Sequence, residues 1–173
     1  MELFALYLGG KAPNANIEQH DVVFWVTSDL KSDYDHIKSL WFGSPEGVHI
    51  DAIAKINGLE GYRVILKPKT DLDQEFEVSK ENALKLFFIN FGADGAGKFT
   101  EIHESGFFVA ENKTEAIKKA KSKLLKNESG VHLDDLYSID DCLVVNDKLG
   151  FEITLEPSEG YCIEIENCYT ILR

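Results

Sequence analysis

Four of the five histidines in this chain recur at matched positions, each with a carboxylate close by in the sequence, and these pairs are its best candidates for chemistry. His49 precedes Asp51 by two residues, so on a β-strand both side chains would point to the same face. An imidazole and a carboxylate on one face can bind a transition metal together or act as an acid–base pair. The candidate ligand-binding residues are His20, Asp21, His49, Asp51, His103, Glu104, His132 and Asp134.

These candidates occur twice because the chain is an internal duplication. The stretch Gly47-Val48-His49-Ile50-Asp51 is repeated 83 residues later as Gly130-Val131-His132-Leu133-Asp134. Between residues 3–56 and 86–139, 14 of the 54 aligned pairs are identical, against roughly three expected from average residue usage. The sequence therefore predicts two tandem repeats, residues 1–80 and 81–173, which could pack as one compact unit.

Three interpretations of the repeated histidines are open. Histidines at strand ends beside an aspartate commonly hydrogen-bond loop backbone and fix a turn, and this structural role is the expected one. The alternatives are a site for a ligand or partner, and a centre for metal-assisted or acid–base catalysis. Recurrence within one chain does not separate the three, so no metal, cofactor or catalytic residue is assigned.

The first repeat predicts two strands, a helix and a hairpin, in that order. Apolar runs over residues 3–8 and 20–27 are typical of strands. Apolar side chains at steps of three and four residues predict an amphipathic helix from a Ser28-Asp29 cap to Gly43. Asn57-Gly58 and Gly61 then predict a hairpin whose return strand covers residues 62–66.

The second repeat predicts the same order with a longer hairpin. Asn112 and Glu115 have the form of a capping box. The return strand falls at residues 151–155, where the offset between the copies has grown to 89. Alternating runs at residues 76–78 and 163–166 predict one more exposed strand after each repeat. The expected buried stripe of the helix is Ala116, Ile117, Ala120, Leu124 and Leu125.

Strand, strand, helix, strand, strand, repeated once, predicts an α+β protein with mainly antiparallel sheet and one helix per repeat. Two such halves would be related by a pseudo-two-fold axis, which imitates a symmetric homodimer within one chain. Since the duplication already supplies the symmetric partner, we expect a monomer in solution.

Charge and hydropathy exclude several classes of partner. The net charge of −12 argues against nucleic-acid binding, which depends on Lys and Arg neutralising phosphates. The lysines clustered at residues 113–126 are expected to form a solvated helix face. No apolar run reaches the roughly 18 residues that cross a bilayer, so no membrane partner is expected. We predict a cytoplasmic location and a small molecule or a protein as the partner.

The cysteines and one glycine-rich loop do not indicate a reactive site. Cys142, Cys162 and Cys168 form no C-x-x-C pair and are expected to be reduced thiols. Residues 92–100 match the Gly-Lys part of a phosphate-binding loop, but Phe99 stands where Ser or Thr should bind magnesium. The residues that follow run toward a strand, whereas a phosphate cradle needs a helix N-terminus.

The chain resembles a bacterial domain-of-unknown-function family, number 1543, whose members carry one or two copies of the domain. The resemblance covers nearly the whole chain as two copies and implies a bacterial, soluble origin. It implies no activity, substrate or catalytic residue. It is carried by Leu6-Tyr7-Leu8-Gly9-Gly10 with Ile17-Glu18-Gln19-His20-Asp21, Trp41-Phe42-Gly43, His49-x-Asp51, and His132-Leu133-Asp134-Asp135-Leu136 followed by Asp140-Asp141-Cys142.

Duplication without a recognisable catalytic motif favours a non-enzymatic binding or interaction module, with its site at the seam between the repeats. The alternative is a metal-assisted enzyme that uses the repeated histidines and their neighbouring acids. That alternative requires His20 and His49 to lie within about 10 Å of each other, since metal–ligand bonds are only roughly 2 Å long.

Overall fold

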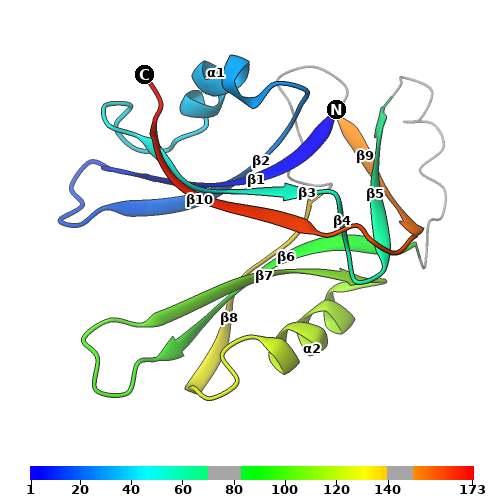
Figure 1. The fold of residues 1–173 in the computed structure, drawn as a ribbon. Helices are drawn as coiled ribbons and strands as arrows, with labels where there is room; N and C mark the ends of the chain where they lie inside the picture. Colours follow the sequence, from blue (N-terminus) through cyan, green and yellow to red (C-terminus); the bar gives the residue numbers. More distant parts are fainter. Residues whose placement is uncertain (70–82, 140–149) are drawn as a thin grey trace. The chain divides into compact units, whose positions relative to one another are not determined.

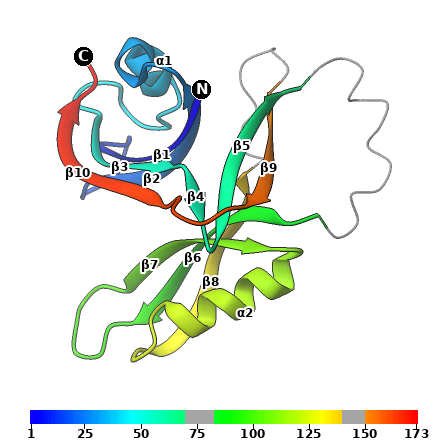
Figure 2. The same ribbon diagram turned by 45° about the vertical axis from the view of Figure 1, so that its right-hand side comes forward.

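The computed structural model of this chain describes residues 1–69, 83–139 and 150–173. Its long strands pair antiparallel and are accompanied by short helices (Figures 1 and 2). The chain divides into two compact units, one made of Met1–Gly58 with Gly160–Arg173 and the other of Leu59–Glu159. The predicted α+β class with mainly antiparallel sheet is confirmed.

The first unit contains a four-stranded sheet in the order β10-β3-β1-β2. Its strands are β1 (Glu2–Gly10), β2 (Gln19–Thr27), β3 (His49–Ile56) and β10 (Ile163–Ile171). The strands predicted at residues 3–8 and 20–27 are confirmed as β1 and β2. The exposed strand predicted at residues 163–166 is confirmed as β10, whereas the equivalent run at residues 76–78 lies outside the described residues.

The second unit repeats this pattern in a three-stranded sheet with the order β7-β6-β8, and it also holds β5 and β9, which pair with each other. The two-residue strand β4 (Gly58–Leu59) pairs with β5 at the boundary between the units. The other strands are β5 (Tyr62–Pro68), β6 (Lys85–Asp94), β7 (Ile102–Ala110), β8 (Ser129–Ser138) and β9 (Phe151–Pro157). The return strands predicted at residues 62–66 and 151–155 are confirmed as β5 and β9.

The sheets β10-β3-β1-β2 and β7-β6-β8 are each covered on one face and bear the repeated histidines on the other. In the second unit Phe87 and Phe91 of β6 pack against Ala116 and Ala120 of α2 (Lys113–Lys123). Because side chains alternate along a strand, Gly92 belongs to the opposite face. In the first unit, similarly, a Cβ at Gly10 would meet the Trp41 indole at 3.2 Å, so Gly9 belongs to the face away from Trp41.

The two helices agree with the predictions from the sequence to different degrees. Asn112 caps α2 by accepting a hydrogen bond from the Glu115 backbone N–H at 3.0 Å, which confirms the capping interaction. The Glu115 carboxylate completes the box one residue earlier than usual, by accepting from the Glu111 N–H at 2.9 Å. The first helix is shorter than predicted: a 3₁₀ turn, η1 (Leu30–Asp33), precedes α1 (Tyr34–Ser39). No helix in the described part of the chain is long and apolar enough to cross a membrane.

The hairpin predicted at Asn57-Gly58 is wrong. Strand β3 pairs with β1 and β10, and β5 pairs with β4 and β9. The tight turn lies instead between β4 and β5, where Glu60 and Gly61 have φ values of 53° and 83°. Two successive positive φ values are what a two-residue hairpin turn requires. The Asn57 amide donates its hydrogen bond to Glu164 of β10 at 2.8 Å.

Strands β5 and β9, one from each predicted repeat, pair with each other. Ile65 is the partner of Thr154, and these residues are equivalent at the repeat offset of 89. An antiparallel pair in which a residue faces its own equivalent has a local two-fold relation. The pseudo-two-fold axis of the whole chain and the repeat limits 1–80 and 81–173 stay predictions.

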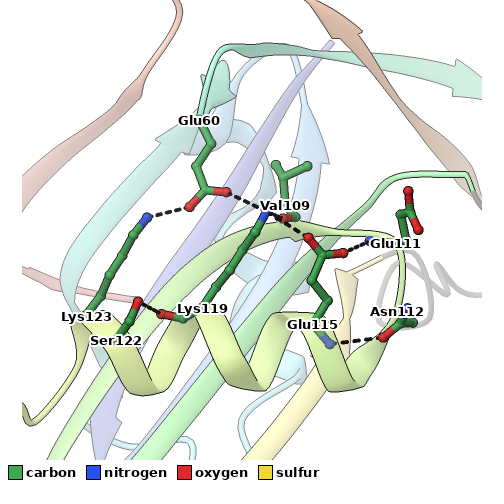
Figure 3. A network of polar contacts seen from close by, with 8 residues as sticks. All are labelled: Glu60, Val109, Glu111, Asn112, Glu115, Lys119, Ser122 and Lys123. Carbon is green, nitrogen blue, oxygen red and sulfur yellow. Dashed lines mark hydrogen bonds and ion pairs between the residues drawn. The ribbon is translucent and has the colours of Figure 1, made fainter.

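A lysine pair on α2 binds the β4–β5 turn (Figure 3). The Glu60 carboxylate accepts from Lys123 Nζ at 2.5 Å and from Lys119 Nζ at 3.5 Å. Lys119 also donates to the Val109 carbonyl at 2.5 Å. Two of the lysines that were expected to form a solvated helix face therefore also hold the turn against the helix.

Removal of the α2 cap should lower the stability of the protein. Asn112→Ala leaves the Glu115 N–H without its side-chain acceptor, so we expect the free energy of unfolding to fall by about 1 kcal/mol. Chemical denaturation followed by circular dichroism measures this. Lys121→Ala, on the same helix, should change stability by less than about 0.5 kcal/mol. Equal effects of the two substitutions would contradict the capping role.

Candidate functional site

The first cluster of candidate residues is organised around Gly9 in the central strand β1. Gly9 is the register partner of His20 on β2 and of His49 on β3, so the two histidines flank it at one level of the sheet. Glu18 lies two residues before His20, and Asp51 lies two residues after His49. This spacing brings all four side chains to the same face, above the glycine.

The two imidazoles and two carboxylates meet there at similar separations. His20 Nε2 lies 3.4 Å from Glu18 Oε1 and 3.4 Å from Asp51 Oδ2. His49 Nε2 lies 3.3 Å from the same Glu18 oxygen and 3.4 Å from Asp51 Oδ1. Potential ligand atoms of Glu18, His20 and Asp51 all lie within 4.8 Å of one another, and His49 contacts both carboxylates of this group.

The convergence depends on the missing side chain of Gly9. A Cβ atom there would lie 2.6 Å from His49 Nε2, 2.7 Å from Asp51 Oδ2 and 3.1 Å from Glu18 Oε1. The first two distances are shorter than van der Waals contact allows. Only glycine therefore leaves the polar atoms free to meet over the strand.

The Gly47 carbonyl selects the tautomer of His49. It lies 2.9 Å from His49 Nδ1, and because a carbonyl oxygen only accepts, Nδ1 must carry a hydrogen. In the neutral ring, Nε2 then presents its lone pair to the carboxylates. Gly47 has a φ of 78°, a backbone conformation that favours glycine. His49 thus anchors its own turn with one nitrogen and faces His20 across the cluster with the other.

His49 Nε2 is buried and forms no hydrogen bond. His49 is only 2% exposed, and two carboxylate oxygens lie within 3.4 Å of Nε2 without forming a hydrogen bond to it.

A β-bulge brings Asp51 into the cluster. The pairing of β1 with β3 shifts after Tyr7, so that Leu8 pairs with Ile50 while Tyr7 pairs with Ala52. Asp51 is the residue left over. The extra residue bends the strand locally, as bulges commonly do beside functional sites, and Asp51 reaches both histidines.

The second repeat builds the same cluster around Gly92, which is the register partner of His103 and His132. His103 Nε2 lies 3.4 Å from both Glu101 and Asp134. His132 Nε2 lies 2.9 Å from Glu101 and 3.2 Å from Asp134. Here too His132 Nδ1 lies 2.9 Å from a glycine carbonyl, two residues earlier.

A family model described as Domain of Unknown Function, DUF1543, matches the chain at residues 15–66 and again at residues 98–149. Each match spans the two acids and two histidines of one cluster. The chain belongs to this family. The confirmed two-copy organisation agrees with the predicted tandem duplication, and each copy is referred to below as a DUF1543 repeat.

The chain is similar over nearly its whole length to a solved structure. It is the crystal structure of a protein Il1583 from Idiomarina loihiensis, with 28% sequence identity and a TM-score of 0.71. The similarity covers 99% of this chain and 98% of that one. No curated protein matches the chain.

The two DUF1543 repeats differ in how far the cluster is covered. The His49 side chain is 3% exposed, whereas that of its equivalent His132 is 50% exposed. In the first repeat the Tyr169 ring of β10 packs on His49 with ring centroids 4.4 Å apart. Tyr7 stacks on His20 at 5.0 Å, and burial together with the Asp51 charge raises the pKa of Tyr7, which keeps its hydroxyl protonated.

Not all the predicted site residues join the clusters. Asp21 and Glu104 follow directly after His20 and His103 on their strands, so they point to the opposite face. Asp21 accepts a hydrogen bond from the Val22 N–H at 2.8 Å, and Glu104 accepts one from the Leu125 N–H at 2.6 Å. The other six predicted residues are brought together, three in each DUF1543 repeat.

Sequence reasoning missed Glu18 and Glu101 as site residues, although both were visible as identical positions in the two repeats. Each lies two residues before a repeated histidine, which is the same-face spacing already used for His49 and Asp51. Applied to both sides of each histidine, that rule would have found them.

The remaining sequence candidates contribute nothing to the clusters. The loop that imitates a phosphate-binding motif leads from β6 to β7, and a strand follows it as predicted. Cys162 is exposed and Cys168 donates to the Ile50 carbonyl at 3.4 Å. Cys142 lies outside the described residues.

The nitrogen–oxygen separations in each cluster match those between ligand atoms around a transition-metal ion. In a tetrahedron with bonds of roughly 2.1 Å, neighbouring ligand atoms are about 3.4 Å apart, and in an octahedron about 3.0 Å. The eight nitrogen–oxygen separations run from 2.9 to 3.4 Å. A divalent ion would also neutralise the two carboxylates that each cluster places together.

The pKa of His132 should be above the ordinary histidine value in metal-free protein. The hydrogen bond to the Gly130 carbonyl is the main cause, and the charges of Glu101, Asp134 and Asp94 add to it. The charged ring is therefore favoured by folding, so its contribution to stability is complete below the ordinary pKa and is lost as pH rises through the raised one.

NMR titration of His132 in chelator-treated protein measures this shift. Glu101→Gln should lower the His132 pKa because it removes a nearby negative charge. Glu128→Gln, which removes a carboxylate that does not act on His132, should leave it unchanged. A His132 pKa at or below the ordinary value would contradict the electrostatics of the cluster.

Proposed function

We propose that this protein is a metal-binding module that holds one divalent transition-metal ion in each DUF1543 repeat. The ligands in the first repeat are Glu18, His20, His49 and Asp51. Those in the second are Glu101, His103, His132 and Asp134. Imidazole and carboxylate together suit zinc, manganese, iron, cobalt or nickel.

The observation that carries this proposal is the buried Nε2 of His49. A buried polar atom that forms no hydrogen bond is costly, and two carboxylate oxygens lie 3.3 and 3.4 Å from this one. A metal ion between the three atoms would accept the nitrogen lone pair and balance both negative charges. The Gly47 carbonyl supports the same assignment, because metal-binding histidines usually donate their second ring N–H to such an acceptor.

One site in each repeat replaces the single site expected at the seam between the repeats. The expected binding role is unchanged, and the residues that bind are those that the duplication preserved. A monomeric state and a cytoplasmic location stay predictions beside it.

A metal-assisted enzyme is the second candidate. This candidate requires His20 and His49 to lie within about 10 Å of each other. They do, because both contact the same Glu18 oxygen. Catalysis would further need a coordination position that the protein leaves to solvent or substrate.

Metal analysis of purified protein tests the proposal directly. We expect two ions per chain after dialysis against zinc, manganese, cobalt or nickel, and a higher melting temperature for at least one of these metals. His20→Ala and His103→Ala should each reduce the count to one, since both histidines are partly exposed and their removal leaves the core intact. His36→Ala, which removes the histidine without a repeat equivalent, should leave two. A protein that stays free of metal would refute the proposal.

The glycines provide a second test that leaves every ligand in place. Gly9→Ala should abolish binding in the first repeat, because the added Cβ would occupy the space where three ligand atoms meet. Gly92→Ala should do the same in the second repeat, where the added Cβ would lie 2.8 Å from His132 Nε2, Asp134 Oδ2 and Glu101 Oε1. Each variant is the control for the other, with folding checked by circular dichroism. Two bound ions in either variant would contradict the proposed geometry.

A further inference from the structure

The two clusters share their ligands but not their surroundings. In the first repeat, both imidazoles lie against tyrosine rings, Tyr169 on His49 and Tyr7 on His20. In the second repeat, the position of Tyr7 is taken by Asn90, whose side chain accepts a hydrogen bond from Ser105 at 2.8 Å. Within the described parts of the chain, His103 and His132 stack on no ring.

Strand β10 makes the first cluster the more enclosed one. It pairs with β3 along the metal-binding segment, with Ile171 opposite His49 and Thr170 opposite Ile50. The Leu172 N–H donates to the Val48 carbonyl at 2.9 Å. In the second sheet, by contrast, β8 is the outermost of the described strands, and His103 and His132 are 51% and 50% exposed.

The charge around the clusters also differs. Asp94 lies directly against Gly130 and acts electrostatically on His132, so it is a third carboxylate near this ring, in addition to Glu101 and Asp134. A divalent ion in the second repeat would therefore leave a net negative charge. The position equivalent to Asp94 in the first repeat is Lys11, which carries the opposite charge.

On the basis of the proposed metal binding, we propose that the two ions are unequal. The first repeat releases its ion slowly because Tyr169 keeps the buried His49 ligand from swinging away and keeps water from replacing it. The second repeat holds an exchangeable ion that accepts an outside ligand between its half-exposed imidazoles. The net negative charge at that site favours a neutral nitrogen donor, such as an imidazole or an amine, over an anion.

Metal release to a coloured chelator separates the two ions. Protein loaded with two equivalents of zinc should release one quickly and one at least about tenfold more slowly, the scale on which supporting contacts alter metal affinity. His103→Ala should retain only the slow phase and His20→Ala only the fast phase.

Tyr169→Ala should bring the slow phase close to the fast one without changing the stoichiometry. Ile165→Ala is the matched control, since Ile165 lies on the same strand and both side chains are 68% exposed. A slow phase that survives in Tyr169→Ala, or that disappears equally in Ile165→Ala, would overturn the role of the tyrosine.

The visible spectrum of cobalt-loaded protein identifies the open position. Imidazole should perturb the cobalt bands of the wild type and of His20→Ala, which keeps the second site, and should leave His103→Ala unchanged. Azide, the anionic probe, should need a concentration at least about tenfold higher, because the three carboxylates repel it.

The outcomes distinguish the two proposals. A chain that binds no zinc or cobalt refutes the metal-binding function. Two ions released at equal rates refute the inequality alone. A response to azide as strong as that to imidazole, or a response of neither, refutes the open site for a nitrogen donor.

Discussion

The physical constraint on which each repeat depends is the meeting of two carboxylates and two imidazoles over a single glycine. The like charges of Glu18 and Asp51 repel each other, and His49 Nε2 is removed from water without a hydrogen bond. An arrangement of this kind is costly unless a cation joins the groups. Gly9, the Gly47 carbonyl and the bulge at Asp51 all hold the groups in this arrangement, so each of these local features supports a cation site.

The exchange of strands between the sequence repeats explains how two similar clusters acquired different surroundings. Strand β10 follows the second repeat in the chain but pairs with β3 of the first. Strand β5 follows the first helix-containing segment but pairs with β9. Tyr169 therefore covers the first cluster because of how the chain is connected, and not because of the cluster residues, which are identical in the two copies.

The local structure was largely predictable from sequence where a single element decides it. The cap at Asn112, the buried face of α2 and the strands β1 and β2 follow from periodicity and capping chemistry, because each depends on residues within a few positions of one another. The hairpin at Asn57-Gly58 failed for the opposite reason. Asn-Gly is a good turn sequence, but β3 gains longer pairings on both edges from β1 and β10, and the positive φ values of Glu60 and Gly61 supply the turn further on.

The sequence by itself determined the duplication, the α+β class and the identity of the polar residues that recur, since a strand's two-residue period fixes which side chains share a face. Six of the recurring identities are the two acid and two histidine positions and the two glycines that position them. Only the tertiary structure decided that the histidines meet in pairs within each repeat. That depends on strand register across β1 and β6, which places residues 29 positions apart on either side of one glycine. It also decided that Glu18 and Glu101 belong to the clusters while Asp21 and Glu104 do not, because only the folded sheet shows on which side each of these side chains lies.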